Sequence, residues 1–106
     1  MAAVTFSPKS RQDLLDTGDH IAKDSRANAR RFVGKFMEQC QLIGTSPMGY
    51  VGREDLAPGL RMAASDRYVI FFRVIDGKVR IERVLHGARN LPVVLRHDSE
   101  PITAGT

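Results

Sequence analysis

The chain has 106 residues, 42% apolar and 26% charged, which is enough for one ordinary globular domain and too short for two. Sixteen Lys and Arg against twelve Asp and Glu give a net charge of +4. That charge favours an anionic partner, such as a nucleic acid, a nucleoprotein surface or an acidic protein segment, although a mildly basic solvated surface carries the same charge.

Cysteine content and hydropathy exclude further classes of protein. Cys40 is the single cysteine, so an internal disulfide is excluded, and it lacks the Cys and His neighbours of a zinc site. We therefore expect no metal and no other cofactor. The first residues do not resemble a signal peptide, and no stretch approaches the roughly 20 apolar residues that cross a bilayer. A cytoplasmic protein that is not associated with a membrane is expected.

The chain is predicted to begin with a short strand and a helix. Residues 4–7, Val-Thr-Phe-Ser, are rich in β-branched and aromatic side chains and end at Pro8, as a brief strand does. Apolar residues then recur at helical spacing, which predicts a helix over residues 9–24. Two starts are open for it: Ser7 as N-cap with Pro8 in the first turn, or a capping box that begins at Ser10.

A second helix follows, and it carries the strongest periodic signal in the chain. Asp24 or Ser25 can cap it, and Gly44 followed by Pro47 is expected to end it. Gly34 within this helix suggests close packing against the first one. The two helices should form a hairpin with a common apolar face, to which the second contributes Ala29, Phe32, Val33, Phe36, Met37, Cys40 and Ile43.

The second half of the chain has β character. Residues 45–59 have loop composition, and Asp76-Gly77 is a strong hairpin turn. The alternation slips at Val84 and Leu85, so the last strand either contains a bulge or stops early. A short helix is expected at residues 91–95. The three strands are predicted at residues 59–64, 67–75 and 79–86.

This order predicts an α+β fold, β-α-α-β-β-β, with the helical hairpin packed on one face of a small, mostly antiparallel sheet. A single domain is expected over residues 1–96, with a flexible tail at 97–106. One row of the central strand should face away from the helices and remain uncovered. We expect the row of Tyr68, Ile70 and Phe72 to bind a partner, because an uncovered apolar row is a typical interaction site.

Several segments, taken together in order and spacing over about residues 4–95, resemble the RelE/ParE toxin superfamily, and its ParE branch more closely. The segment from Arg83 to Leu91 is the most specific of them. The residues that carry the resemblance are Asp13-Leu14, Ile21-Ala22, Ala29 to Val33, Gly59-Leu60-Arg61, Tyr68 to Arg73, and Arg83 to Leu91.

The resemblance implies a toxin of a type II toxin–antitoxin system, held silent by an antitoxin segment that wraps around it. ParE-like members poison DNA gyrase, whereas RelE-like members cut messenger RNA on the ribosome. The cognate antitoxin would be ParD-like, with an acidic binding segment that matches the +4 charge here. No small-molecule substrate is implied.

The two activities require different chemistry. Cleavage of RNA through the 2′-hydroxyl needs a base, an acid and cations around the phosphate. RelE-like enzymes commonly use basic residues and a tyrosine near the C-terminus, but no tyrosine follows Arg89 here. The leading hypothesis is therefore a gyrase-binding inhibitor without catalytic residues. The alternatives are a ribonuclease that uses Arg61, His86 and Arg89, or a non-toxic member that only binds its antitoxin.

The basic residues of this pattern complete the expected partner-binding surface. Arg61 and Arg89 match basic positions of the superfamily, although a salt-bridged rim would look the same in the sequence. Among the residues of this pattern, His86 is the one whose ordinary pKa suits proton exchange near neutral pH, and a structural role at a strand end is its alternative. The full expected surface is Arg61, Tyr68, Ile70, Phe72, Arg73, Arg83, His86 and Arg89.

Overall fold

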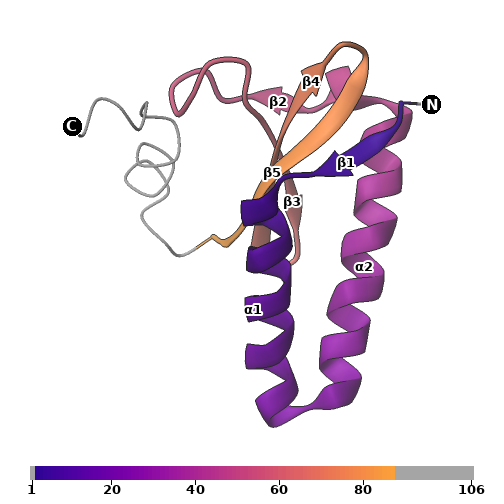
Figure 1. Ribbon diagram of the computed structural model, residues 1–106, viewed down its shortest axis with the longest axis vertical. Helices are drawn as coiled ribbons and strands as arrows, with labels where there is room; N and C mark the ends of the chain where they lie inside the picture. The colour runs from indigo at the N-terminus through magenta and orange to yellow at the C-terminus, as the bar shows by residue number, and fades with distance from the viewer. Residues whose placement is uncertain (1, 88–106) are drawn as a thin grey trace.

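The computed structural model describes residues 2–87 of the chain (Figure 1). Three predicted features lie outside the described residues: Arg89, the short helix at 91–95 and the tail at 97–106. Within residues 2–87, neither helix combines the length and the apolar character needed to cross a membrane.

Two serines fix the ends of the helical hairpin. Helix α1 (Pro8–Asp24) begins where the Ser7 side chain accepts the backbone N–H of Ser10 at 3.0 Å, so the first of the two possible starts is correct. Ser25 then ends α1 and opens α2 (Arg26–Thr45). Its N–H bonds to the Ile21 carbonyl, and its side chain accepts the N–H of Asn28 at 3.1 Å.

The sheet has five strands in the order β1-β5-β4-β3-β2. β1 is parallel to β5, and the other neighbours are antiparallel, so the α+β prediction is confirmed. The 3-10 turn η1 (Pro47–Gly49) and the short strand β2 were not predicted, because their segment has loop composition. The strands are β1 (Val4–Phe6), β2 (Val51–Gly52), β3 (Arg61–Ser65), β4 (Tyr68–Ile75) and β5 (Lys78–His86).

The turn between β4 and β5 is the one that the sequence predicts. Asp76 and Gly77 both have positive φ, 52° and 75°, the geometry of a type I′ turn that suits the twist of a hairpin. Further along, Phe72 pairs with Ile81 while Phe71 pairs with Arg83. One residue of β5 is therefore extra, which is a β-bulge.

The bulge, with Glu82 as its extra residue, explains the slip in the apolar alternation. After it, Val84 returns to the helix-covered face with Val79 and Ile81, whereas Leu85 lies on the opposite face with Phe71. A strand that stopped early would not have placed both side chains in apolar cores. The bulge is thus the correct one of the two alternatives.

Both faces of the sheet are covered, which corrects the expectation of an open apolar row. Ile70 and Phe72 are fully buried beneath the helices with Phe36, Cys40 and Ile43. They are consequently unavailable to a partner, although the sequence analysis expected both to lie on the partner-binding surface. On the other face, the segment between β2 and β3 folds back over Phe71, using the apolar side chains Leu56, Ala57 and Leu60.

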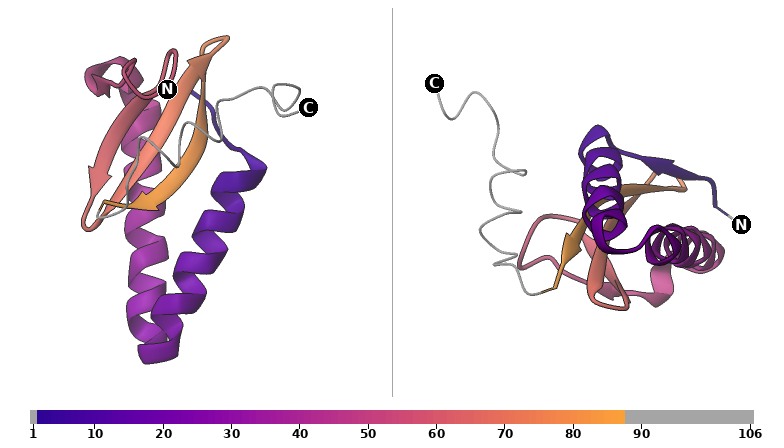
Figure 2. Two further views of the ribbon diagram at one scale, coloured as in Figure 1. Left: turned by 90° about the vertical axis from the view of Figure 1, so that its left-hand side faces the viewer. Right: turned by 90° about the horizontal axis from the view of Figure 1, so that it is seen from below.

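The helical hairpin extends well beyond the end of the sheet (Figure 1), and Figure 2 shows its two helices together on one side of that sheet. Cys40 lies above the sheet and is buried as predicted, whereas Met37 and Val33 are exposed by 43% and 39%. The helical period alone therefore overstated the core. The expected close packing at Gly34 is also wrong, because nothing lies within 4 Å of a Cβ placed there.

Candidate functional site

Two grooves flank the bulged end of β5, one on each side of α1's first turns. The first, which we call the α1 groove, has a volume of about 740 Å³ and lies between α1 and the ends of β4 and β5. It is lined from the helix mainly by Lys9, Gln12, Asp16 and His20, and from the sheet by Tyr68, Arg83 and His86.

Asp13 closes the base of the α1 groove by binding α1 to β5. Its carboxylate accepts hydrogen bonds from Nε and Nη2 of Arg83, at 2.7 and 2.9 Å, and from the backbone N–H of Val84 at 3.0 Å. Both side chains are only 13% exposed. Arg83, expected from the sequence to contact a partner, therefore has a structural role in joining the helix to the sheet.

Tyr68 and His86 lie together at the sheet end of the α1 groove. Their rings meet edge to face with centroids 5.3 Å apart, and Phe32 of α2 packs edge-on against Tyr68 at 4.9 Å. Tyr68 is half-buried and His86 is exposed. Of the residues chosen from the sequence, this pair is brought together on an accessible surface.

Arg61 belongs to a different part of the molecule. Its Nη1 donates to the carbonyl oxygen of Tyr50 at 2.6 Å, which ties β3 to the segment that leads into β2. Arg61 pairs with Phe72, whereas His86 pairs with Tyr68 on the other side of β4. These pairs lie four positions apart along β4, or about 13 Å at 3.3 Å per residue. Arg61 and His86 do not form one site.

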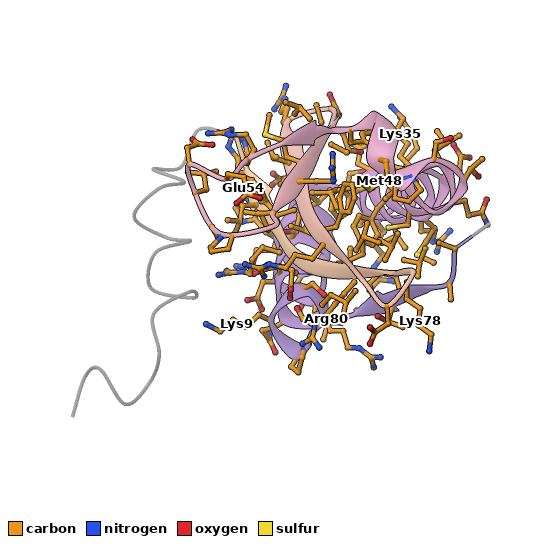
Figure 3. The ribbon with its side chains drawn as sticks, turned by 90° about the horizontal axis from the view of Figure 1, so that it is seen from above. Lys9, Lys35, Met48, Glu54, Lys78 and Arg80 are labelled. Atoms are coloured by element: carbon orange, nitrogen blue, oxygen red, sulfur yellow. The ribbon has the colours of Figure 1, made fainter. Side chains whose placement is uncertain are left out.

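The second groove, which we call the arginine groove, lies between the start of α1, the loop before β3 and the outer side of β4 and β5. Its volume is about 730 Å³, and Lys9 and Arg83 line both grooves. Its lining comprises Ser7, Pro8, Lys9, Ala57, Pro58, Leu60, Arg73, Arg80, Glu82 and Arg83. Figure 3 shows Lys9 and Arg80 on this side of the molecule.

Glu82 organises the arginine groove. Its Oε2 accepts Nη1 of Arg73 at 2.8 Å, and its Oε1 accepts Nε of Arg80 at 3.2 Å. Arg73 also donates from Nε to the carbonyl oxygen of Pro58 at 2.9 Å, which holds the covering loop to β4. The sequence pointed to Arg73 but not to Arg80 or Lys9. The register of the Asp76-Gly77 hairpin pairs Arg73 with Arg80, and this was the signal that could have found Arg80. Lys9 comes to the same groove because β1 lies parallel to β5 and α1 begins soon after β1.

Cys40 has no role in either groove. It is buried between α2 and the sheet, and burial raises the pKa of its thiol to about 12. A thiol with that pKa is protonated at neutral pH and is a poor nucleophile. Across residues 2–87, no three His, Cys, Asp or Glu side chains gather in a way that suits a metal ion.

Comparison with known proteins identifies the family. A family model described as the ParE toxin of the type II toxin–antitoxin system parDE matches residues 4–91. No curated protein matches the chain. A solved structure of the chromosomal ParDE TA system from P. aeruginosa is similar, with a TM-score of 0.70 and 22% identity; the match covers 81% of this chain and 96% of that one. Since the family model spans most of the chain, the protein belongs to the ParE toxin family of type II toxin–antitoxin systems.

Proposed function

We propose that this protein inhibits DNA gyrase and is neutralised by a ParD-like antitoxin. Family membership supports the antitoxin, since the family model is that of the toxin of a parDE pair. The observation that supports gyrase over messenger RNA is the separation of Arg61 from His86, because RNA cleavage needs its proton donors, acceptors and cations around one phosphate. The site of action would be the bacterial cytoplasm.

The partner surface that we propose differs from the one expected from the sequence. Ile70 and Phe72 are excluded by burial, and Arg83 is engaged by Asp13. Tyr68 and His86 remain as an accessible pair, and Arg73 remains at the rim of the arginine groove. Apolar contacts come from exposed side chains of the hairpin and the turn after it, namely Leu15, Val33, Met37, Leu42 and Met48.

The direct test is expression of the toxin in cells that lack the antitoxin. A gyrase poison should cause filamentation and a DNA-damage response before protein synthesis falls. Co-expression of the neighbouring open reading frame should restore growth. Arrest of translation with cleaved messages as the first event would contradict the proposal, and an absence of any growth defect would favour a non-toxic, antitoxin-binding protein.

A ribosome-dependent ribonuclease is the second candidate, and one observation favours it. Tyr68 and His86 are in contact in a groove that Lys9 also lines, which gives two groups capable of proton transfer in one groove with a cation. Under this alternative, Tyr68→Phe and His86→Ala each abolish toxicity without loss of antitoxin binding. Under gyrase inhibition, neither hydroxyl nor imidazole transfers a proton, and the Tyr68→Phe protein remains toxic.

A further inference from the structure

The arginine groove combines an excess of positive charge with an apolar wall. Arg73 and Arg80 both bind the single carboxylate of Glu82, so one negative charge faces two guanidinium groups. Lys9 adds a further cation from the first turn of α1, a turn that contains no acidic residue. The positive end of the helix dipole acts in the same direction.

The hydrogen-bonding capacity of these arginines is only partly used. Arg80 is 46% exposed, and within residues 2–87 its Nε is the one guanidinium atom with an acceptor. The Nη1 and Nη2 groups of Arg80 therefore retain the planar fork that binds a carboxylate with two parallel hydrogen bonds. Arg73 is held more firmly, because it also bonds the carbonyl oxygen of Pro58.

The apolar wall of the groove that a ligand can reach consists of two exposed prolines. Pro8 lines it from the start of α1 and Pro58 from the loop before β3, whereas Ala57 and Leu60 lie behind them and are only 4% and 2% exposed. A phosphate ion or the backbone of a nucleic acid would use the cations and leave this wall against water. A peptide that carries an apolar residue beside acidic ones would use both walls. The volume of about 730 Å³ is of the size that holds several side chains.

We propose that the arginine groove binds an acidic peptide segment, with a carboxylate on Arg80 and an apolar side chain against Pro8 and Pro58. We take the peptide to be the acidic segment of the antitoxin, and in this one respect the inference rests on the proposed function. Binding would join the start of α1, the bulge of β5 and the covering loop. The complex should accordingly unfold at a higher temperature than the toxin alone.

The test uses the full-length protein and a capped synthetic peptide of alternating Glu-Glu-Leu units, with a Gln-for-Glu version as the neutral control. The acidic peptide should shift the side-chain Nε–H resonances of Arg73 and Arg80 in nitrogen-15 NMR spectra, and the neutral one should not. Arg80→Gln should weaken binding by about tenfold, the value of one hydrogen bond to a charged group.

Lys78→Gln is the matched control. Lys78 lies on the same strand two residues from Arg80, is exposed and is outside the groove lining, and its substitution removes the same charge (Figure 3). It should change the affinity by less than about twofold, because exposed charges interact weakly. An unchanged backbone spectrum of the Arg80→Gln protein would show that its fold is intact.

Three outcomes would overturn the inference. Equal weakening by Arg80→Gln and Lys78→Gln would show that the peptide responds only to net charge. Shifts confined to residues outside the groove would place the peptide elsewhere. A 20-base-pair duplex that shifts the Arg73 and Arg80 resonances at lower concentration than the peptide would assign the groove to nucleic acid. Inhibition of gyrase is measured without any peptide, so the proposed target can fail while the groove still binds peptide.

Discussion

Replacing Asp13 with alanine should destabilise the protein more than an alanine substitution at any exposed residue of α1. The substitution leaves the Arg83 guanidinium, 13% exposed, without its carboxylate and the Val84 N–H without its acceptor. Breaking a buried ion pair costs about 3–5 kcal/mol. The pair lies at a strand edge that water can reach, so we expect about 3 kcal/mol, or a fall in Tm of about 15 °C.

Asp16→Ala provides the control on the same helix. Asp16 is exposed and accepts one hydrogen bond, from the Gln12 side chain at 2.8 Å, so its loss should cost less than about 0.5 kcal/mol. Urea denaturation followed by circular dichroism measures both variants. In a double-mutant cycle, Asp13→Ala with Arg83→Met should cost at least about 1 kcal/mol less than the sum of the two changes. Equal denaturation midpoints for Asp13→Ala and Asp16→Ala would refute this reasoning.

Three further predictions concern buried or constrained positions. In thermal unfolding, Gly44→Ala should lower the free energy of unfolding by about 1–3 kcal/mol, because its Cβ would lie 3.0 Å from the backbone oxygen of Ala2. Gly34→Ala in the same helix should raise the free energy of unfolding by about 1 kcal/mol, because nothing lies within 4 Å of its Cβ. Gly77→Ala, at φ 75°, should lower the unfolding free energy by about 1 kcal/mol, and an unchanged Tm would contradict the turn geometry. Cys40, with its pKa raised by burial to about 12, should react with a disulfide reagent at pH 8 only after urea unfolds the chain. Since this raised pKa favours the protonated folded form, its contribution to stability should be lost as pH rises from about 9 to 12, and Cys40→Ala should flatten that loss.

Local signals in the sequence were sufficient for the elements whose ends depend on single side chains. Ser7 and Ser25, each one of two candidate caps in the sequence, fix the helix starts, and Asp76-Gly77 fixes the hairpin, because each acts within three residues of its own position. The resemblance of several segments to ParE toxins identified the family. In contrast, Gly44 was expected to end α2 but lies inside it. The start of the chain, far from Gly44 in sequence, leaves no room for a side chain at this position. A Cβ at Gly44 would lie 3.0 Å from the backbone oxygen of Ala2 and 3.0 Å from the Val4 side chain.

The site was less predictable, because its geometry depends on contacts between distant segments. The row that contains Ile70 and Phe72 could be assigned to a face only once the position of the helices was known. The loop after β2 covers the other face through Leu56 and Leu60, and loop composition gave no indication of this. Arg80 and Lys9 line one groove because β1 pairs in parallel with β5, with Thr5 opposite Arg80, and α1 begins soon after β1.

The proposed function predicts a defined effect on one purified enzyme. Gyrase incubated with supercoiled plasmid, ATP and this protein should accumulate linear, cleaved DNA after detergent treatment, and addition of the antitoxin should reverse the accumulation. Ribosomes programmed with a defined messenger should retain intact message under the same conditions. Cleaved messenger together with unaffected gyrase reactions would contradict the account and transfer the activity to the groove that holds Tyr68 and His86.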